Sequence, residues 1–207
     1  GINAKEHSNP DKDGFKSNSV NLFISGEANK SLSFELMATQ TTGTNQYDGW
    51  VNALEYDTDF KDQVIATKLK SHIGENMDLT LSLSELRDES DNPAEESYFN
   101  TLRNAASIQA DYYFENDIVS FGVDTYKDKV DSKTNYRENE RENNALFMQY
   151  QGYFSVLSLQ MAYRHDRNEA SGSANTGNIN LGFPISQQTQ LHVSYGNAFK
   201  APTITDL

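Results

Sequence analysis

The stretch Leu79-Thr80-Leu81-Ser82-Leu83-Ser84, LTLSLS, decides the fold of this chain, because apolar and polar residues alternate along it with a period of two. Successive side chains of a β-strand point to opposite faces, so this pattern predicts a strand with one apolar and one polar face. Similar alternation marks ten segments, at roughly 18–28, 31–41, 62–73, 77–87, 101–114, 118–128, 143–153, 155–166, 176–185 and 189–199. We therefore predict an all-β protein, an antiparallel meander of about ten strands.

Two kinds of connection alternate between these segments. Short turns are expected at 29–30, 74–76, 115–117, 154–155 and 186–188, and long polar loops at 1–17, 42–61, 88–100, 129–142 and 167–175. A meander with these connections places every short turn at one end and every long loop at the other. This asymmetry is typical of outer-membrane β-barrels. A soluble β-sandwich, with one dry and one wet face per sheet, is the alternative.

The composition fits a sheet whose two faces differ. The chain has 207 residues, of which 36% are hydrophobic, and it carries 11 tyrosines and 11 phenylalanines. In a membrane barrel only the lipid-facing side chains must be apolar, so a low hydrophobic content is compatible with order. With 30 acidic and 17 basic residues the net charge is -13, which argues against nucleic acid as a partner.

The N-terminal stretch NPDKDGF, residues 9–15, resembles the first half of an EF-hand calcium loop. Asp11 and Asp13 supply carboxylates and Gly14 suits the sharp turn, but position 12 of the loop falls on Val20, which has no side-chain oxygen. The hairpin 18–41 brings the loop 42–61 alongside, so further oxygens can come from that loop. The candidate calcium ligands are Asp11, Asp13, Tyr47, Asp48 and Asp57. The alternative is that these acidic loops are simply solvated.

Two motifs carry a resemblance to a known family. SYGNAFKAPTITDL, residues 194–207, resembles the strand-and-loop motif of TonB-dependent outer-membrane receptors. DKDGF at 11–15, with QYDGW at 46–50, more narrowly resembles the calcium-binding loops of the cobalamin (vitamin B12) receptors in that family. The resemblance implies that Asp11, Asp13, Tyr47 and Asp48 bind calcium. It implies the same of Asp57, for which Asp59 is an alternative.

The resemblance also implies an architecture and a function. Residues 1–207 would form a partial transmembrane β-barrel domain, part of a 22-stranded barrel whose plug domain and C-terminal strands lie outside the sequence. The expected activity is cobalamin uptake across the bacterial outer membrane. The expected partners are cobalamin or another large scarce nutrient, TonB, through the N-terminal region, and outer-membrane lipid.

Other functions remain open at this point. A siderophore or haem receptor shares the family motif, and a soluble calcium-binding β-domain would explain the acidic loops. A passive porin would lack the motif at 194–207. Catalysis is not expected, because His192 and Ser194 lie two apart on one strand with no carboxylate marked to orient the histidine. The sequence assigns no substrate-binding residues.

Overall fold

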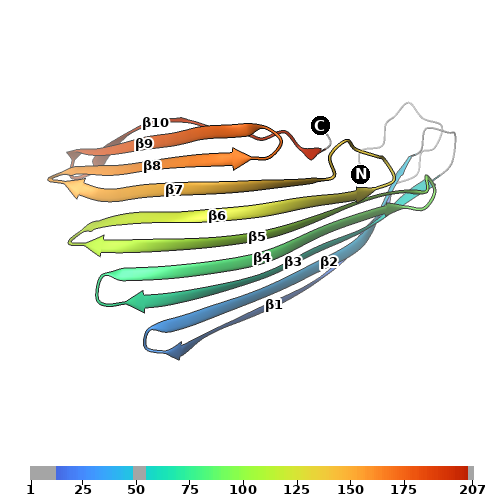
Figure 1. Cartoon of the computed structure of the whole chain (residues 1–207), viewed down its shortest axis with the longest axis horizontal. Helices are drawn as coiled ribbons and strands as arrows, with labels where there is room; N and C mark the ends of the chain where they lie inside the picture. The colour runs from blue at the N-terminus through green and yellow to red at the C-terminus, as the bar shows by residue number, and fades with distance from the viewer. Residues whose placement is uncertain (1–12, 49–54, 205–207) are drawn as a thin grey trace.

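Ten antiparallel strands form one sheet in the computed structural model, which describes residues 13–48 and 55–204. The strands are β1 (Phe15–Asn29), β2 (Leu32–Asp48), β3 (Glu55–Ile73), β4 (Met77–Asn92), β5 (Ser97–Phe114), β6 (Asp117–Ser132), β7 (Glu140–Phe154), β8 (Leu157–Asn168), β9 (Gly172–Ser186) and β10 (Thr189–Asn197). Each strand pairs only with its neighbours in sequence, so the sheet runs in order from β1 to β10 (Figure 1). The predicted meander of ten strands is confirmed.

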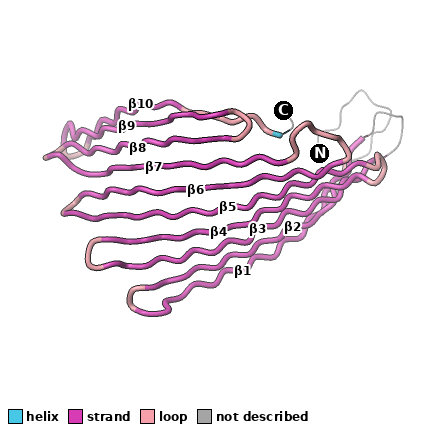
Figure 2. Tube along the Cα trace, in the orientation of Figure 1, coloured by secondary structure: helices cyan, strands magenta, loops and turns pink. Residues whose placement is uncertain are grey.

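The predicted turns are confirmed at one end of the sheet, but the predicted long loops are wrong in length. Five tight connections lie at one end, after β1, β3, β5, β7 and β9 (Figure 2). At the other end most residues predicted as loop belong to strands. Residues 42–48 and 55–61, for example, pair with each other along β2 and β3. Polar residues dominate these segments and obscure the alternation, although Tyr47, Tyr56 and Phe60 share one face and the backbone hydrogen bonds of the ladder continue.

Strand register collects the apolar side chains on one face. Cross-strand partners share a face, and Leu81 of the opening stretch lies opposite Leu69 on β3 and Ile108 on β5. We call this side the apolar face. It includes Leu22, Phe34, Leu69, Leu81, Ile108, Phe121, Val123, Leu146, Met148, Met161, Ile179 and Val193.

The opposite side of the sheet carries charged groups from β2 to β8, and we call it the polar face. It includes Glu35, Lys68, Lys70, Asp78, Arg103, Asp124, Asp128, Arg141, Arg164 and Asp166. Lys68 and Lys70 lie on this face of β3, and Arg164 lies on it in β8.

A second layer is absent from the described part of the chain, and with it a conventional core. The buried apolar residues there are only Ala110, Val130, Ala145 and Ile204. Large apolar side chains stay open, with Phe121 52% and Leu146 55% exposed. The described residues therefore do not form the predicted alternative, a β-sandwich, whose second sheet would cover this face. Among the described residues no helix has the length and apolarity to cross a membrane.

Candidate functional site

Those predicted calcium ligands that the structure describes lie at the end of the sheet away from the tight turns. Three of them, Asp13, Tyr47 and Asp57, have described side chains, whereas Asp11 and the Asp48 side chain lie outside the described part. Gly14 faces Gln46, because Gln46 N donates to Gly14 O at 2.8 Å and Gly14 N donates to Gln46 Oε1 at 3.1 Å. Asp13 precedes Gly14 and Tyr47 follows Gln46, so the β1–β2 pairing brings Asp13 and Tyr47 next to one another.

Asp57 does not share this arrangement. It lies opposite Gln46 in the β2–β3 ladder, so it points to the other face of the sheet from Tyr47. The Tyr47 ring stacks on Tyr56 with centroids 5.9 Å apart, and its hydroxyl accepts a hydrogen bond from Asn92 Nδ2.

Asp59, the alternative ligand to Asp57, accepts a hydrogen bond from Thr44 Oγ1 at 2.6 Å. Within the described ranges no three His, Cys, Asp or Glu side chains form a group that could hold a metal ion. The calcium site therefore stays a prediction, and it depends on Asp11 and Asp48.

The polar face carries a row of three charged groups that sequence reasoning did not find. Asp128 lies opposite Arg103 on β5 and Arg141 on β7. Arg103 Nε and Nη2 donate to its two oxygens at 2.5 and 2.9 Å, and Arg141 Nη2 donates to Oδ2 at 2.8 Å. The Arg103 guanidinium also lies over the Tyr126 ring, 4.5 Å from its centroid.

The row has two further consequences. Burial alone would raise the pKa of Asp128, but the hydrogen bonds from Arg103 and Arg141 outweigh it and lower the pKa below its usual value. Asp128 lies past the apolar part of β6, because the residues beside it on the other face are Lys127 and Lys129. Arg141 Nη1 also donates to the Pro202 carbonyl, so the FKAPT stretch of the family-like motif folds back onto this row.

A second network of ion pairs connects β6 and β8 across the small residue Ala145 of β7. Arg164 of β8 donates to Asp124 of β6 at 2.6 and 3.0 Å and to Asp166 at 2.8 Å. Ala145 lies between the two aspartates in the ladder, and its short side chain leaves the guanidinium room to reach across β7. Asn143 Nδ2 adds a hydrogen bond to Asp166 at 2.9 Å. These contacts connect β6, β7 and β8 on the polar face.

A third cluster lies close to the tight turns. Asp78 is 5% exposed and accepts hydrogen bonds from Lys70 Nζ at 2.8 Å and from the Tyr113 hydroxyl at 3.0 Å. His72 Nδ1 makes a further hydrogen bond to it. The pairing registers create all three clusters. A single sequence carries no direct signal of register between residues as far apart as Arg103 and Asp128, 25 residues, or Asp124 and Arg164, 40 residues.

His192 and Ser194 lie on the polar face of β10, opposite Gly182 and Asn180 of β9. Both are exposed. The described residues place no carboxylate in hydrogen-bond contact with His192, so this pair has no catalytic arrangement.

Comparison with known proteins places this geometry in a family. The family model described as "TonB dependent receptor-like, beta-barrel" matches residues 3–207. A protein of Photobacterium profundum named vitamin B12 transporter BtuB is 26% identical over 98% of the chain. One of the same name from Vibrio cholerae is 28% identical over 94%. The chain spans about one third of the length of each of these relatives.

Solved structures share the fold at low sequence identity. A mutant of the ferric enterobactin receptor PfeA from Pseudomonas aeruginosa, in complex with enterobactin, superimposes with a TM-score of 0.73 over 93% of this chain and 35% of its own, at 12% identity. The siderophore receptor PirA from Acinetobacter baumannii gives a TM-score of 0.71 over 92% of this chain and 34% of its own, at 13% identity. At these identities the comparison establishes the fold alone.

Proposed function

The chain belongs to the TonB-dependent receptor β-barrels, transporters of the bacterial outer membrane, and from that membership we propose that it forms wall strands of a cobalamin (vitamin B12) transporter. The observation that carries the proposal is the match to two vitamin B12 transporters over 94–98% of the chain. In this assignment the apolar face meets lipid and the polar face lines the lumen.

The ion-pair networks suit a lumenal wall. A transporter barrel must keep its shape while a nutrient and the segments inside the lumen move past the strands. Arg103, Asp128 and Arg141 tie β5, β6 and β7 together, and Arg164 ties β8 to β6. Each charge is satisfied within the wall, so passing groups meet a rigid polar surface. TonB, which gives the family its name, would supply the driving force in the whole protein.

Uptake in cells tests the proposal. A host that lacks its own cobalamin transporter would express the whole protein and receive radiolabelled cyanocobalamin, with a ferric siderophore offered in parallel. We expect cobalamin uptake that disappears when tonB is deleted. Siderophore-dependent growth without cobalamin uptake would overturn the cargo while leaving the family intact.

Calcium binding at the β1–β2 end is a second part of the proposal. It is supported by the neighbouring positions of Asp13 and Tyr47 and by the net charge of -13, which gives a cation a physical role. Calcium takes ~6–8 oxygen ligands and is more tolerant of irregular geometry than magnesium. Binding would order the two loop segments together, since the ligands meet only when the hairpin has formed.

Calorimetric titration of calcium into wild type, Asp13→Asn and Asp48→Asn tests this part. We expect each variant to bind more weakly and the double variant not to bind, with magnesium a poor substitute. Glu169→Gln is the control, because it removes a carboxylate at the same end of the sheet, next to β8. Adding Asp57→Asn and Asp59→Asn decides between those two residues. Wild-type affinity in the Asp13 and Asp48 variants would reject the site.

A further inference from the structure

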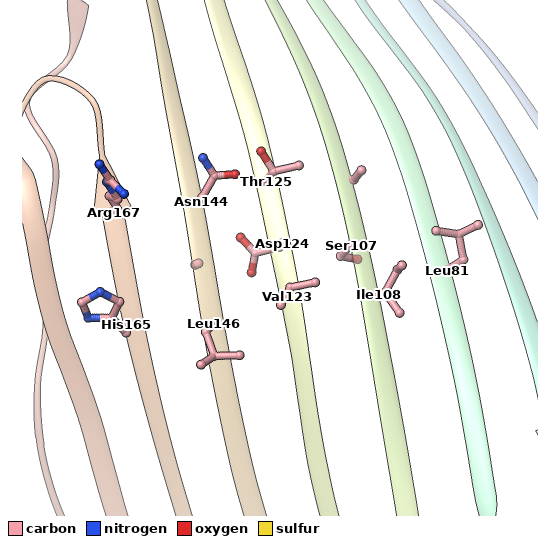
Figure 3. A pocket seen from close by; sticks show the side chains of 12 residues that line it. Leu81, Ser107, Ile108, Val123, Asp124, Thr125, Asn144, Leu146, His165 and Arg167 are labelled. Atoms are coloured by element: carbon pink, nitrogen blue, oxygen red, sulfur yellow. The ribbon is translucent and has the colours of Figure 1, made fainter.

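The apolar face is hollowed near the middle of the sheet. A groove of about 520 Å³ runs across β4 to β8, with Leu81, Ile108, Val123 and Leu146 among its lining (Figure 3). Ala106 lies opposite Leu83 on one side and Thr125 on the other. Ala106 and Thr125 are smaller than the apolar side chains around them, and the depression forms above them.

Polarity changes along the groove. In Figure 3 the apolar side chains Val123, Ile108 and Leu146 lie below, and Thr125, Asn144 and Arg167 lie above them. These three polar residues form one row, because Thr125 lies opposite Asn144 and Asn144 opposite Arg167. The row is on the side of the longer connections, which in an outer-membrane barrel is the extracellular side.

Arg167 differs from the other arginines of the strands. Arg87, Arg103, Arg141 and Arg164 each form an ion pair with a carboxylate. Arg167 is exposed and has no such ion pair with any described residue.

The nearest carboxylates along the ladder are bonded elsewhere. Glu142 Oε1 accepts a hydrogen bond from Asn144 Nδ2 at 2.7 Å, and Glu169 Oε2 accepts one from Glu142 N at 3.1 Å. Among the described residues the Arg167 guanidinium thus has no ion-pair partner, and it lies at the head of an apolar groove.

We propose that this groove binds one phosphorylated lipid of the outer leaflet. An acyl chain lies along Ile108, Val123 and Leu146, and the phosphate meets Arg167. The planar guanidinium matches a phosphate with two parallel hydrogen bonds, and buried methylene groups add to the affinity. His165, which also lines the groove, lies opposite Leu146, one row below Arg167 (Figure 3). The proposal rests on the outer-membrane location and is independent of the cargo.

Native mass spectrometry of the whole protein, purified in neutral detergent, tests the headgroup. The probes are phosphatidylglycerol, diacylglycerol with the same acyl chains but no phosphate, and glycerol 3-phosphate, which has no chain. We expect one phosphatidylglycerol to be retained in preference to diacylglycerol, and no binding of glycerol 3-phosphate. Arg167→Gln should weaken phosphatidylglycerol binding about tenfold, as expected for the loss of a charge-assisted hydrogen bond.

Lys16→Gln is the matched control, because Lys16 is an exposed cation on the same face and at the same end, on β1. It should leave binding unchanged. Equal affinity for both lipids, or wild-type binding by Arg167→Gln, would overturn the phosphate contact.

A second pair of variants tests the groove itself. Ala106→Trp fills the depression and should reduce retention of both lipids, whereas Ala38→Trp on β2 adds the same ring to the apolar face away from the groove. Tryptophan is tolerated at a lipid-facing surface, so both variants are expected to fold. Equal lipid retention by the two variants would show that the chain does not lie in the groove. If the wild type forms dimers and Ala106→Trp is monomeric, the groove binds a second copy of the chain instead.

Discussion

Asp128 joins three strands through one side chain that is 3% exposed. Its two oxygens accept hydrogen bonds from two arginines, which have no other ion-pair partner among the described residues. Burying a charge is costly unless it is paired, and removing one member of a buried group leaves the others uncompensated. Loss of the Asp128 charge would therefore destabilise the fold mainly because Arg103 and Arg141 would lose their counter-charge.

Asp128→Asn should lower the free energy of unfolding by about 3 kcal/mol, because Arg141 would then be buried without a counter-charge. The control is Glu85→Gln, which removes a pair whose side chains are 36% and 46% exposed and should cost less than about 1 kcal/mol. Urea unfolding of the protein in lipid vesicles measures both. Equal midpoints for the two variants would contradict this role.

Acid should remove the difference in unfolding free energy between wild type and Asp128→Asn. Because the folded-state pKa of Asp128 is lowered, its contribution is fully present above its ordinary pKa of 3.8 and is lost as the pH falls through the lowered value. The difference in unfolding free energy between wild type and Asp128→Asn should therefore shrink below about pH 4. A difference that stays constant into strong acid would show that the ion pairs do not cause it.

Tight turns set the hairpins at one end of the sheet. Gly74 has a φ of 66°, which glycine adopts freely, but Glu115 and Ser155 have φ of 52° and 57° in two-residue connections. Left-handed backbone costs a side-chain-bearing residue about 1–2 kcal/mol. Two of the five tight turns therefore carry backbone strain.

Glu115→Gly should stabilise the protein by about 0.5–1 kcal/mol, since glycine relieves the strain but is freer in the unfolded chain. Glu75→Gly is the matched control. It replaces a glutamate in the neighbouring turn, where φ is not positive, and should give no gain. Thermal unfolding in detergent compares the two. A gain from Glu75→Gly as large as that from Glu115→Gly would reject the strain argument.

The sequence predicts the elements better than their extent. All ten strands follow from alternation, because residues such as Leu79, Leu81 and Leu83 must share one face. The strand ends at 42–48 and 55–61 were predicted as loop because polar residues dominate them, and the few aromatic side chains that share a face, Tyr47, Tyr56 and Phe60, give only a weak period. Backbone hydrogen bonds, which leave no trace in side-chain pattern, continue the ladder.

At the scale of the whole molecule, the sheet separates two environments. Met148 points to the apolar face and is 53% exposed, and Gln149 beside it points to the polar face. Lipid on one side and water on the other explain why 36% hydrophobic residues suffice.

Met148→Arg should therefore destabilise the membrane-inserted protein by about 2–4 kcal/mol, because it places a charge among lipid tails. Gln149→Arg, one residue along, should cost much less, since the lumenal face accepts charge. Urea unfolding from lipid vesicles measures both. Similar losses for the two variants would mean that the sheet does not divide lipid from water.

The candidate site was predictable only in part. The proximity of Asp13 and Tyr47 followed from the hairpin 18–41, a short-range argument that needs no exact register. The opposite orientation of Asp57 required knowing that it pairs with Gln46, and one residue of slip reverses the face. The row through Asp128 depends on two registers at once, which no local motif announces.

The strict neighbour-to-neighbour order of the strands has a consequence for how such walls arise. Every hairpin closes over a short length of chain, so the entropy cost of each new pairing stays small as the sheet grows. A nascent wall can therefore be extended one hairpin at a time, each using the exposed edge of the last as its template. The same order allows such barrels to evolve by duplication or deletion of whole hairpins, because the pairings within every other hairpin stay intact. Bacterial barrels of this kind have even strand numbers, as growth by whole hairpins requires.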